Sequence, residues 1–163
     1  MHSSPWVVVS LVAAMAGSGV VAAAAENTSL FFEGDMVRGG SAAGVTGPAC
    51  VLASQFKRRE LIVWRIRVRD ANGQNVDAGA LKSLVVELPD GQRFAARFGP
   101  HPRGQDTDTF WSASWTVPAD YPTGTFAYKV VATDKGGASQ TWAPFNVAPS
   151  QLTIIAGDVT FTK

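Results

Sequence analysis

Apolar and polar side chains alternate along most of the chain from residue 50 onward. The alternation is clearest at residues 61–70, where one face is apolar and the other is mostly arginine. The apolar face carries Ile62, Trp64, Ile66 and Val68, and the other face carries Val63, Arg65, Arg67 and Arg69. Successive side chains of a strand point to opposite faces, so this pattern predicts a strand with one buried face.

Further short segments with the same period follow, separated by turn residues. The predicted strands occupy residues 84–88, 93–98, 111–117, 125–133, 139–147 and 151–155. The Asp90-Gly91 pair after the first of these is typical of a tight hairpin. One helical turn is expected near residues 78–82, and Pro144 is expected to break its strand or to place it at an edge. Seven or eight short strands predict an all-β fold, an antiparallel sandwich or barrel.

The N-terminal segment has a different composition. The first 25 residues contain no Asp, Glu, Lys or Arg, and their apolar run ends in four alanines before Glu26. This pattern is typical of a secretory signal peptide cleaved before Glu26. An uncleaved anchor is the alternative, since about 20 apolar residues can span a bilayer. We expect cleavage, because Ala, Gly and Ser weaken the hydrophobicity of the run, and therefore a periplasmic or secreted protein without a membrane span.

The remaining length suits one domain. Residues 26–48 are rich in glycine and alanine, so we expect them to form a flexible leader. The folded domain is expected at residues 49–156 and a short tail at residues 157–163. With 14 basic and 13 acidic side chains, the net charge of +1 gives no reason to expect a nucleic-acid partner. A single cysteine excludes an internal disulfide and the paired-cysteine zinc motifs.

Four segments occur in a characteristic order: Pro89-Asp90-Gly91, residues 111–118, residues 120–130, and residues 132–137 with their two glycines. In this order they resemble the immunoglobulin-like and fibronectin type III-like domains of bacterial extracytoplasmic proteins. The resemblance covers roughly residues 50–155. It implies an antiparallel immunoglobulin-like β-sandwich of seven to eight strands, in which residues 120–130 lead from one sheet to the other. The chain departs from antibody domains in having no second cysteine, so Trp64 and Trp115 are expected to carry the core packing.

Catalytic motifs are absent from the sequence. Cleavage of the signal peptide would leave one histidine, His101, and one cysteine, Cys50. No Gly-x-Ser-x-Gly nucleophile elbow, Gly-x-Gly-x-x-Gly loop or Walker-type loop is present. We therefore expect a protein that is not an enzyme and needs no cofactor.

Metal binding is the alternative function. Cys50, His101 and Met36 are soft or borderline ligands that suit copper. A blue-copper site needs two histidines, however, and unpaired cysteines are commonly small buried apolar residues. The competing interpretation places Cys50 in the core, His101 in a loop between two prolines, and Met36 in the leader.

The arginine-rich face offers a second candidate site. Arg65, Arg67 and Arg69 recur at every second position of one predicted strand, and Arg93 and Arg97 follow on the next hairpin. A row of guanidinium groups can bind carboxylates, because each planar fork donates two hydrogen bonds at once. The alternative is that Glu87 and nearby aspartates pair with these arginines on the surface.

The sequence as a whole favours a non-catalytic extracytoplasmic binding module. We expect it to be an accessory or protein-interaction subunit of a periplasmic assembly, with another periplasmic or extracellular protein as its partner. A strand edge or the face of Arg65, Arg67, Arg69, Arg93 and Arg97 would form the interface. A periplasmic copper-binding protein is the principal alternative, and polysaccharide binding through an outward-facing Trp111 or Trp142 is a third.

Overall fold

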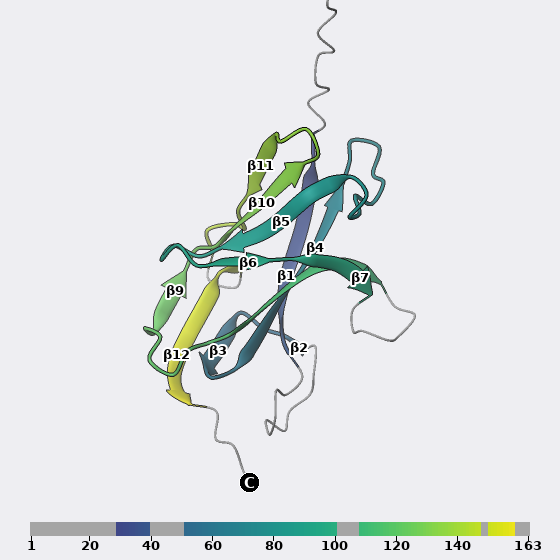
Figure 1. Ribbon diagram of the computed structural model, residues 1–163. Helices are drawn as coiled ribbons and strands as arrows, with labels where there is room; N and C mark the ends of the chain where they lie inside the picture. The colour runs from purple at the N-terminus through teal and green to yellow at the C-terminus, as the bar shows by residue number, and fades with distance from the viewer. Residues whose placement is uncertain (1–28, 40–50, 101–107, 148–149, 159–163) are drawn as a thin grey trace, which may run out of the picture.

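The computed structural model describes residues 29–39, 51–100, 108–147 and 150–158 of the chain. These residues form an all-β structure of short strands (Figure 1). The strands are β1 (Phe31–Arg38), β2 (Val51–Leu52), β3 (Gln55–Arg58), β4 (Leu61–Arg69), β5 (Leu81–Glu87), β6 (Arg93–Ala95), β7 (Arg97–Pro100), β8 (Thr109–Thr116), β9 (Gly124–Phe126), β10 (Lys129–Asp134), β11 (Ser139–Trp142) and β12 (Leu152–Asp158).

The first sheet has five strands in the order β2-β1-β4-β8-β7, and all neighbours are antiparallel. Its central strand β4 is the strand that the alternation at residues 61–70 predicts, so that prediction is confirmed. Trp64 on β4 lies opposite Met36 on β1 and opposite Ala113 on β8. The apolar side chains of β4 consequently share one face with those of both neighbours.

The second sheet has four antiparallel strands in the order β11-β10-β5-β6. A third, smaller sheet has the order β3-β12-β9, in which β12 runs parallel to β3 and antiparallel to β9. The turn between β5 and β6 closes through two hydrogen bonds, from the Leu88 N–H to the carbonyl of Gln92 and from the Gly91 N–H to the carbonyl of Leu88, and Gly91 adopts a φ of 87° there. A residue with a Cβ is strained at such a φ, which is why the predicted hairpin needs this glycine.

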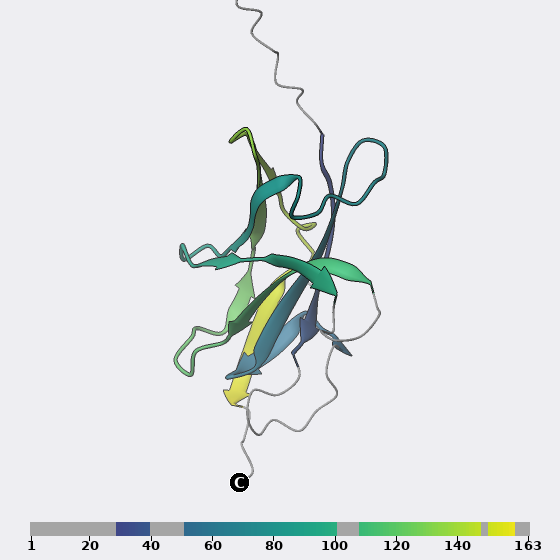
Figure 2. The ribbon, with the colours of Figure 1, turned by 45° about the vertical axis from the view of Figure 1, so that its right-hand side comes forward.

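Two predicted strands are each divided between sheets. The strand expected at residues 93–98 is interrupted at Ala96, whose N–H donates to the carbonyl of Leu84. The chain therefore leaves the second sheet as β6 and joins the first as β7 (Figures 1 and 2). The strand expected at residues 125–133 is likewise divided into β9, which pairs with β12, and β10, which pairs with β5.

The other differences are small. The segment expected at residues 139–147 ends as a strand at Trp142, before Pro144, as the missing proline N–H leads one to expect. The helical turn expected near residues 78–82 is instead a short turn that leads directly into β5 at Leu81. β12 extends to Asp158, two residues beyond the expected end of the domain.

The largest correction concerns the leader. Residues 31–38, expected to be part of a flexible leader, form β1 and pair with β4 along all eight positions. Met36 and Val37 are buried there. Gly34 makes the segment look flexible in sequence, yet a Cβ at this position would lie 2.9 Å from Cη2 of Trp142. The glycine thus makes room for an indole ring on the inner face of a strand.

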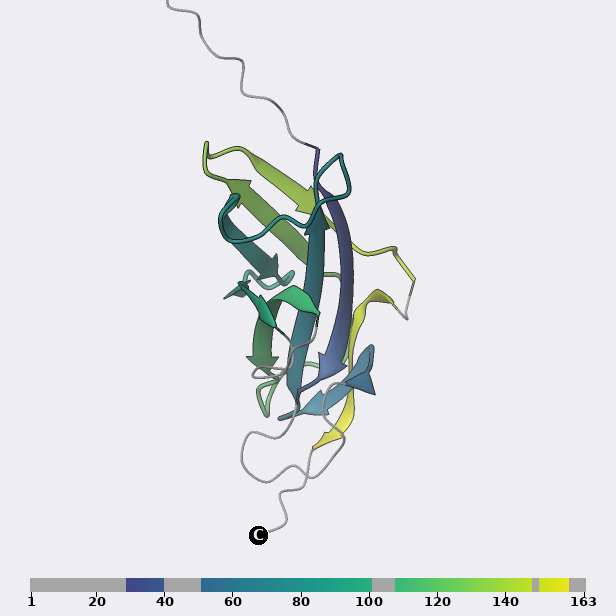
Figure 3. The ribbon, with the colours of Figure 1, turned by 90° about the vertical axis from the view of Figure 1, so that its right-hand side faces the viewer.

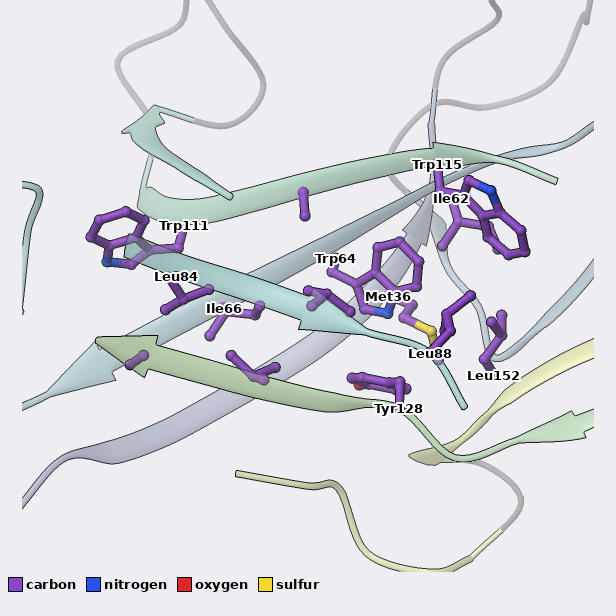
Figure 4. Close-up of a cluster of buried hydrophobic side chains, with 14 of the residues drawn as sticks. Met36, Ile62, Trp64, Ile66, Leu84, Leu88, Trp111, Trp115, Tyr128 and Leu152 are labelled. Carbon is purple, nitrogen blue, oxygen red and sulfur yellow. The ribbon is translucent and has the colours of Figure 1, made fainter. Parts of the chain in front are cut away.

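The core lies where the first sheet faces the second (Figure 4). The Trp64 ring lies 5.5 Å from that of Phe94, 6.0 Å from Tyr128 and 6.4 Å from Trp115, measured between centroids. Trp64 and Trp115 therefore do pack in the core, together with aromatic rings of the second sheet. Aromatic contacts of this kind add about 0.5–1.5 kcal/mol each beyond the burial of their area.

Candidate functional site

Four of the five arginines of the predicted face, Arg65, Arg67, Arg69 and Arg97, lie on the outer face of the first sheet, whereas Arg93 lies on β6 of the second sheet. The strand register places Asp35 of β1, Arg65 of β4, Ser112 of β8 and Arg97 of β7 in one row across four strands. Residues opposite one another in neighbouring strands share a face, so this row is a continuous polar stripe on the side away from the core. Sequence reasoning placed the arginines on one face but could not supply the acidic partners from β1.

Arg65 is fully engaged within this stripe. Its Nε–H and Nη2–H donate to Oδ1 and Oδ2 of Asp35, both at 2.7 Å. The Arg65 side chain is only 18% exposed. A bidentate pair of this geometry holds both side chains in place, and it leaves little of the guanidinium for a ligand.

Arg67 is held in a similar way. Its Nη2–H donates to Oδ2 of Asp108 at 2.9 Å, and its Nη1 lies 3.9 Å from Oε2 of Glu33. The guanidinium carbon also stands 4.7 Å from the ring centroid of Phe110, and that of Arg65 stands 5.2 Å from the same centroid. The two cations thus cover one aromatic ring, an arrangement that adds a cation–π attraction to the ion pairs.

Arg69 completes the group on β4. Its Nε lies 3.7 Å from Oε1 of Glu33, and its Nη1–H donates to the carbonyl of Gly73 at 3.2 Å. All three β4 arginines therefore have acidic or carbonyl partners in the fold. The alternative interpretation of surface pairing describes them well, although the acids are Asp35, Glu33 and Asp108 rather than Glu87.

The expected pairing of Glu87 with an arginine of the group is confirmed at Arg93, and Glu87 also pairs with Lys129. It lies 2.9 Å from Nη2 of Arg93 through Oε1 and 2.9 Å from Nζ of Lys129 through Oε2. The hydrogen bond from Lys129 and the charge of Arg93 hold the pKa of Glu87 below its ordinary value, and they outweigh the opposing effect of burial. Arg93 is consequently bound on one side by a carboxylate.

Arg97 differs from the other four arginines of the predicted face. Its side chain is exposed, and among the residues that the structure describes it makes no ion pair and no side-chain hydrogen bond. It lines a shallow hollow of about 430 Å³ at the junction of β6, β7 and β8. The lining residues are Arg93, Phe94, Ala95, Arg97, Ser112 and Ser114. Two guanidinium groups and two hydroxyls there form a set of hydrogen-bond donors suited to an anion.

The residues of the metal hypothesis are not brought together by anything described. Met36 is 4% exposed and belongs to the core. Cys50 and His101 lie outside the described residues, so the copper site stays a prediction. Within the described ranges, no three His, Cys, Asp or Glu side chains gather in a way that could hold a metal ion.

A larger hollow, which the sequence did not reveal, opens beside the inner face of β1. It measures about 700 Å³, and its walls come from residues 32–36 of β1, residues 52–54, Tyr128, Trp142, Pro144, Phe145 and Ser150. Trp142 lines it, with its ring 6.3 Å from that of Phe32. Burial and the nearby charge of Asp35 raise the pKa of Tyr128, so its phenol stays protonated.

The two tryptophans considered for polysaccharide binding have different environments. Trp111 is buried, and its Nε1–H donates to the carbonyl of Val76 at 2.8 Å. Trp142 is half-buried in the wall of the larger hollow. Only Trp142 could contact a ligand in this conformation.

Comparison with known proteins adds no relative. No protein-family model matches this chain, and no curated protein and no solved structure is significantly similar to it. In the part of the chain that the structure describes, no helix is long and apolar enough to cross a membrane.

Proposed function

We propose that this protein is a non-catalytic binding module that works outside the cytoplasm, as an accessory or interaction subunit of a periplasmic or secreted assembly. The observation that carries the proposal is the hollow around Arg97. Four of the five predicted arginines are already paired within the fold. The guanidinium N–H groups of Arg97 have no partner among the described residues, and two serine hydroxyls lie in the same hollow. An exposed donor set on a rigid sheet is suited to binding rather than to turnover.

For the fold we propose an immunoglobulin-like sandwich. The order β1-β4-β8-β7 in the first sheet matches strands A, B, E and D of such domains, and β11-β10-β5 in the second sheet matches G, F and C. The passage from β8 to β10 supports this assignment, because residues 120–130 lead from the first sheet to the second, as the resemblance implies, although β9 within them pairs with β12 of the third sheet. Sandwiches serve many functions, so the fold alone names no activity.

The proposed ligand is a carboxylate-bearing segment of a partner protein. A guanidinium fork binds a carboxylate through two parallel hydrogen bonds, and Ser112 and Ser114 can donate further ones. Arg93 keeps its contact with Glu87 and supplies a second positive charge at the rim. Such a site would speed association and select acidic partners more than it would raise affinity.

The proposed location rests on the N-terminal segment. Its apolar run, free of Asp, Glu, Lys and Arg and ending in alanines, is typical of a secretory signal peptide. Export would put the partner in the periplasm or outside the cell. We propose no nucleic-acid partner, because the chain is nearly neutral.

Charge reversal at Arg97 tests the proposed function. The tagged protein would be cross-linked in its native cell envelope, and the co-purifying partner identified and quantified. We expect the Arg97→Glu variant to lose at least about 90% of the partner, since a carboxylate at this position repels another carboxylate. The Lys135→Glu variant makes the same change of charge in the turn between β10 and β11, and it should retain the partner.

Thermal unfolding of both variants serves as the control for folding. Arg97 makes no described side-chain contact that stabilises the fold, so its melting temperature should stay close to that of the wild type. Undiminished partner recovery with Arg97→Glu would remove this hollow from the interface and, with it, the basis of the proposed function.

A further inference from the structure

The edge of β1 that faces away from β4 is only partly paired. In an antiparallel pair, successive residues direct their N–H and C=O groups alternately to the two sides of the strand. The N–H of Gly39 donates to Leu61 on the β4 side, whereas the carbonyl of Met36 accepts from Ala53 on the other side. Odd-numbered residues of β1 therefore pair with β4, and even-numbered residues direct their backbone groups to the outer edge.

Both ends of this outer edge are occupied. At one end, the N–H of Leu30 donates to Oε1 of Gln140, which reaches over from β11. At the other end, the carbonyl of Met36 is taken by Ala53, and β2 pairs with Val37 and Arg38. Between these ends lie Phe32 and Gly34, whose outward N–H and C=O groups have no partner among the described residues. Four backbone hydrogen-bonding groups, at the two-residue repeat of a strand edge, are thus left without a partner among the described residues.

This gap opens onto the larger hollow of about 700 Å³. Residues 32–36 contribute the β1 wall of the hollow, and Trp142, Pro144, Phe145 and Ser150 also line it. Figure 3 shows β1 beside β4, with residues 143–147, which follow β11, on the other side of β1. Leu52 and Phe145 at the rim are 65% and 84% exposed. Large apolar side chains that stay exposed around a hollow are typical of a surface that a partner covers.

We infer that this gap is a docking site for an extended segment of another polypeptide, which adds to the first sheet as a short strand beside Phe32 and Gly34. Addition of a strand satisfies all four open backbone groups at once, whereas a sugar or a lipid chain offers no donors and acceptors at that repeat. The site is separate from the Arg97 hollow, and the inference does not depend on that hollow.

The side chains around the gap define the chemistry of the segment. A residue paired with Gly34 shares its inner face, so the side chain of that residue enters the hollow beside Met36 and Trp142. The residues before and after it share the outer face with Glu33 and Asp35, whose charges are already met by Arg65, Arg67 and Arg69. The fitting segment is therefore apolar at every second position and polar, with no required charge, in between.

The length of the gap argues against a second copy of this chain as the occupant. From Leu30 to Met36 the edge spans six residues, about 20 Å at the rise of a strand. A short terminus or loop of a partner fits between Gln140 and Ala53. The β1 strand of a second copy is eight residues long and carries its own β2 beside Val37 and Arg38, so the flanking elements would collide.

Peptide selection with a structural readout tests the inference. Random dodecapeptides displayed on phage are panned against the purified protein, and the enriched peptides are synthesised. We expect alternating apolar and polar residues in the enriched sequences. In the complex, amide hydrogen exchange of Phe32 and Gly34 should slow at least about tenfold, because their N–H groups become hydrogen-bonded. The amides of Glu33 and Asp35, already bonded to β4, should not change.

A matched pair of variants isolates the backbone contribution. Phe32→Ala and Phe32→Pro both remove the aromatic ring, but only the proline removes the outward N–H. We expect peptide affinity of Phe32→Pro to be roughly two- to tenfold below that of Phe32→Ala, the loss of one net hydrogen bond. As a control for folding, both variants must keep the chemical-shift dispersion of the wild type in their NMR spectra. Arg97→Glu should bind the peptide as the wild type does.

Four results would overturn the inference. The first is a panning experiment that enriches no peptide, or only peptides that leave the exchange of Phe32 and Gly34 unchanged. The second is equal affinity of the two Phe32 variants. The third is protection of both amides in the concentrated protein alone, with sedimentation as a dimer, which would make a second copy the occupant. The fourth is loss of peptide binding in Arg97→Glu, which would move the peptide to the Arg97 hollow and leave the proposed function standing.

Discussion

The two faces of β4 contribute differently to the stability of the fold. The inner face buries Ile62, Trp64, Ile66 and Val68 almost completely, each at 1% exposure or less. The outer face carries three arginines whose charges are met by acids on β1 and by Asp108. Burial of apolar area contributes most of the stability of a fold, whereas exposed ion pairs contribute about 0–1 kcal/mol each. The difference indicates that the outer face tolerates change at little cost in stability, so it is free to serve in recognition.

The outer face is itself divided. Its centre, on β4, is neutralised by neighbouring side chains, while its margin at β7 leaves Arg97 exposed. A partner therefore gains little from the centre, because it would have to replace bidentate pairs such as Arg65 with Asp35. The margins of the sheet, at β7 and at the outer edge of β1, are where donors and acceptors stay available.

The largest expected effect is at the centre of the inner face. Trp64→Ala should lower the free energy of unfolding by about 3–5 kcal/mol, because it leaves a cavity among Phe94, Tyr128 and Trp115. Urea unfolding followed by circular dichroism measures the loss. Phe145→Ala, at a side chain that is 84% exposed, should change the stability by no more than about 0.5 kcal/mol.

The indole N–H of Trp64 refines this test. It is buried without a hydrogen-bond partner among the described residues. An unsatisfied buried donor costs about 1–3 kcal/mol, so Trp64→Phe should lose clearly less stability than Trp64→Ala. Equal losses in the two variants would show that packing around the ring is not what Trp64 contributes.

An intermediate effect is expected on the outer face. Arg65→Ala removes a bidentate ion pair with Asp35 and should lower the free energy of unfolding by about 1 kcal/mol. Arg97→Ala removes no such contact and should change it by about 0.5 kcal/mol or less. Parallel urea unfolding curves measure both. A larger loss from Arg97→Ala than from Arg65→Ala would contradict the division of this face into a paired centre and a free margin.

The smallest expected effect is a pH dependence from the second sheet. The pKa of Glu87 is lowered in the fold by Lys129 and Arg93, from an ordinary value of 4.5. A carboxyl group with a lowered pKa stabilises the fold above its ordinary pKa, and the contribution is lost as the pH falls through the lowered value. The melting temperature of the wild type should therefore fall below about pH 4.5 more steeply than that of Glu87→Gln.

The carboxyl group of Asp90 also has a lowered pKa, so it too stabilises the fold above its ordinary pKa. Burial acts to raise the pKa of Asp90, but hydrogen bonds from Gln92 and from the phenol of Tyr121 outweigh it and lower the value. Asp90 is unchanged in Glu87→Gln, so both proteins lose its contribution on acidification. Identical melting curves of the two proteins between pH 3 and pH 7 would show that Glu87 is not coupled to folding.

The strands were largely predictable, because alternation of apolar and polar side chains is a local property. The pattern at residues 61–70 located β4 and separated its two faces, and Pro144 marked the end of β11. β1 was missed since Gly34 and the glycine-rich residues after it resemble a linker. Only the Trp142 ring above Gly34 explains why that position needs a glycine.

The candidate sites were predictable only in part. The sequence by itself determined that arginines share a face of β4, since residues two apart in a strand point the same way. Which of them are neutralised depends on strand register, which aligns Asp35 with Arg65 across 30 positions of chain and leaves Arg97 at the margin. The gap at Phe32 and Gly34 likewise exists only because Gln140 and Ala53 close the edge on either side of it. Local patterning thus decided the elements and their faces, and long-range pairing decided which polar groups remain free to bind.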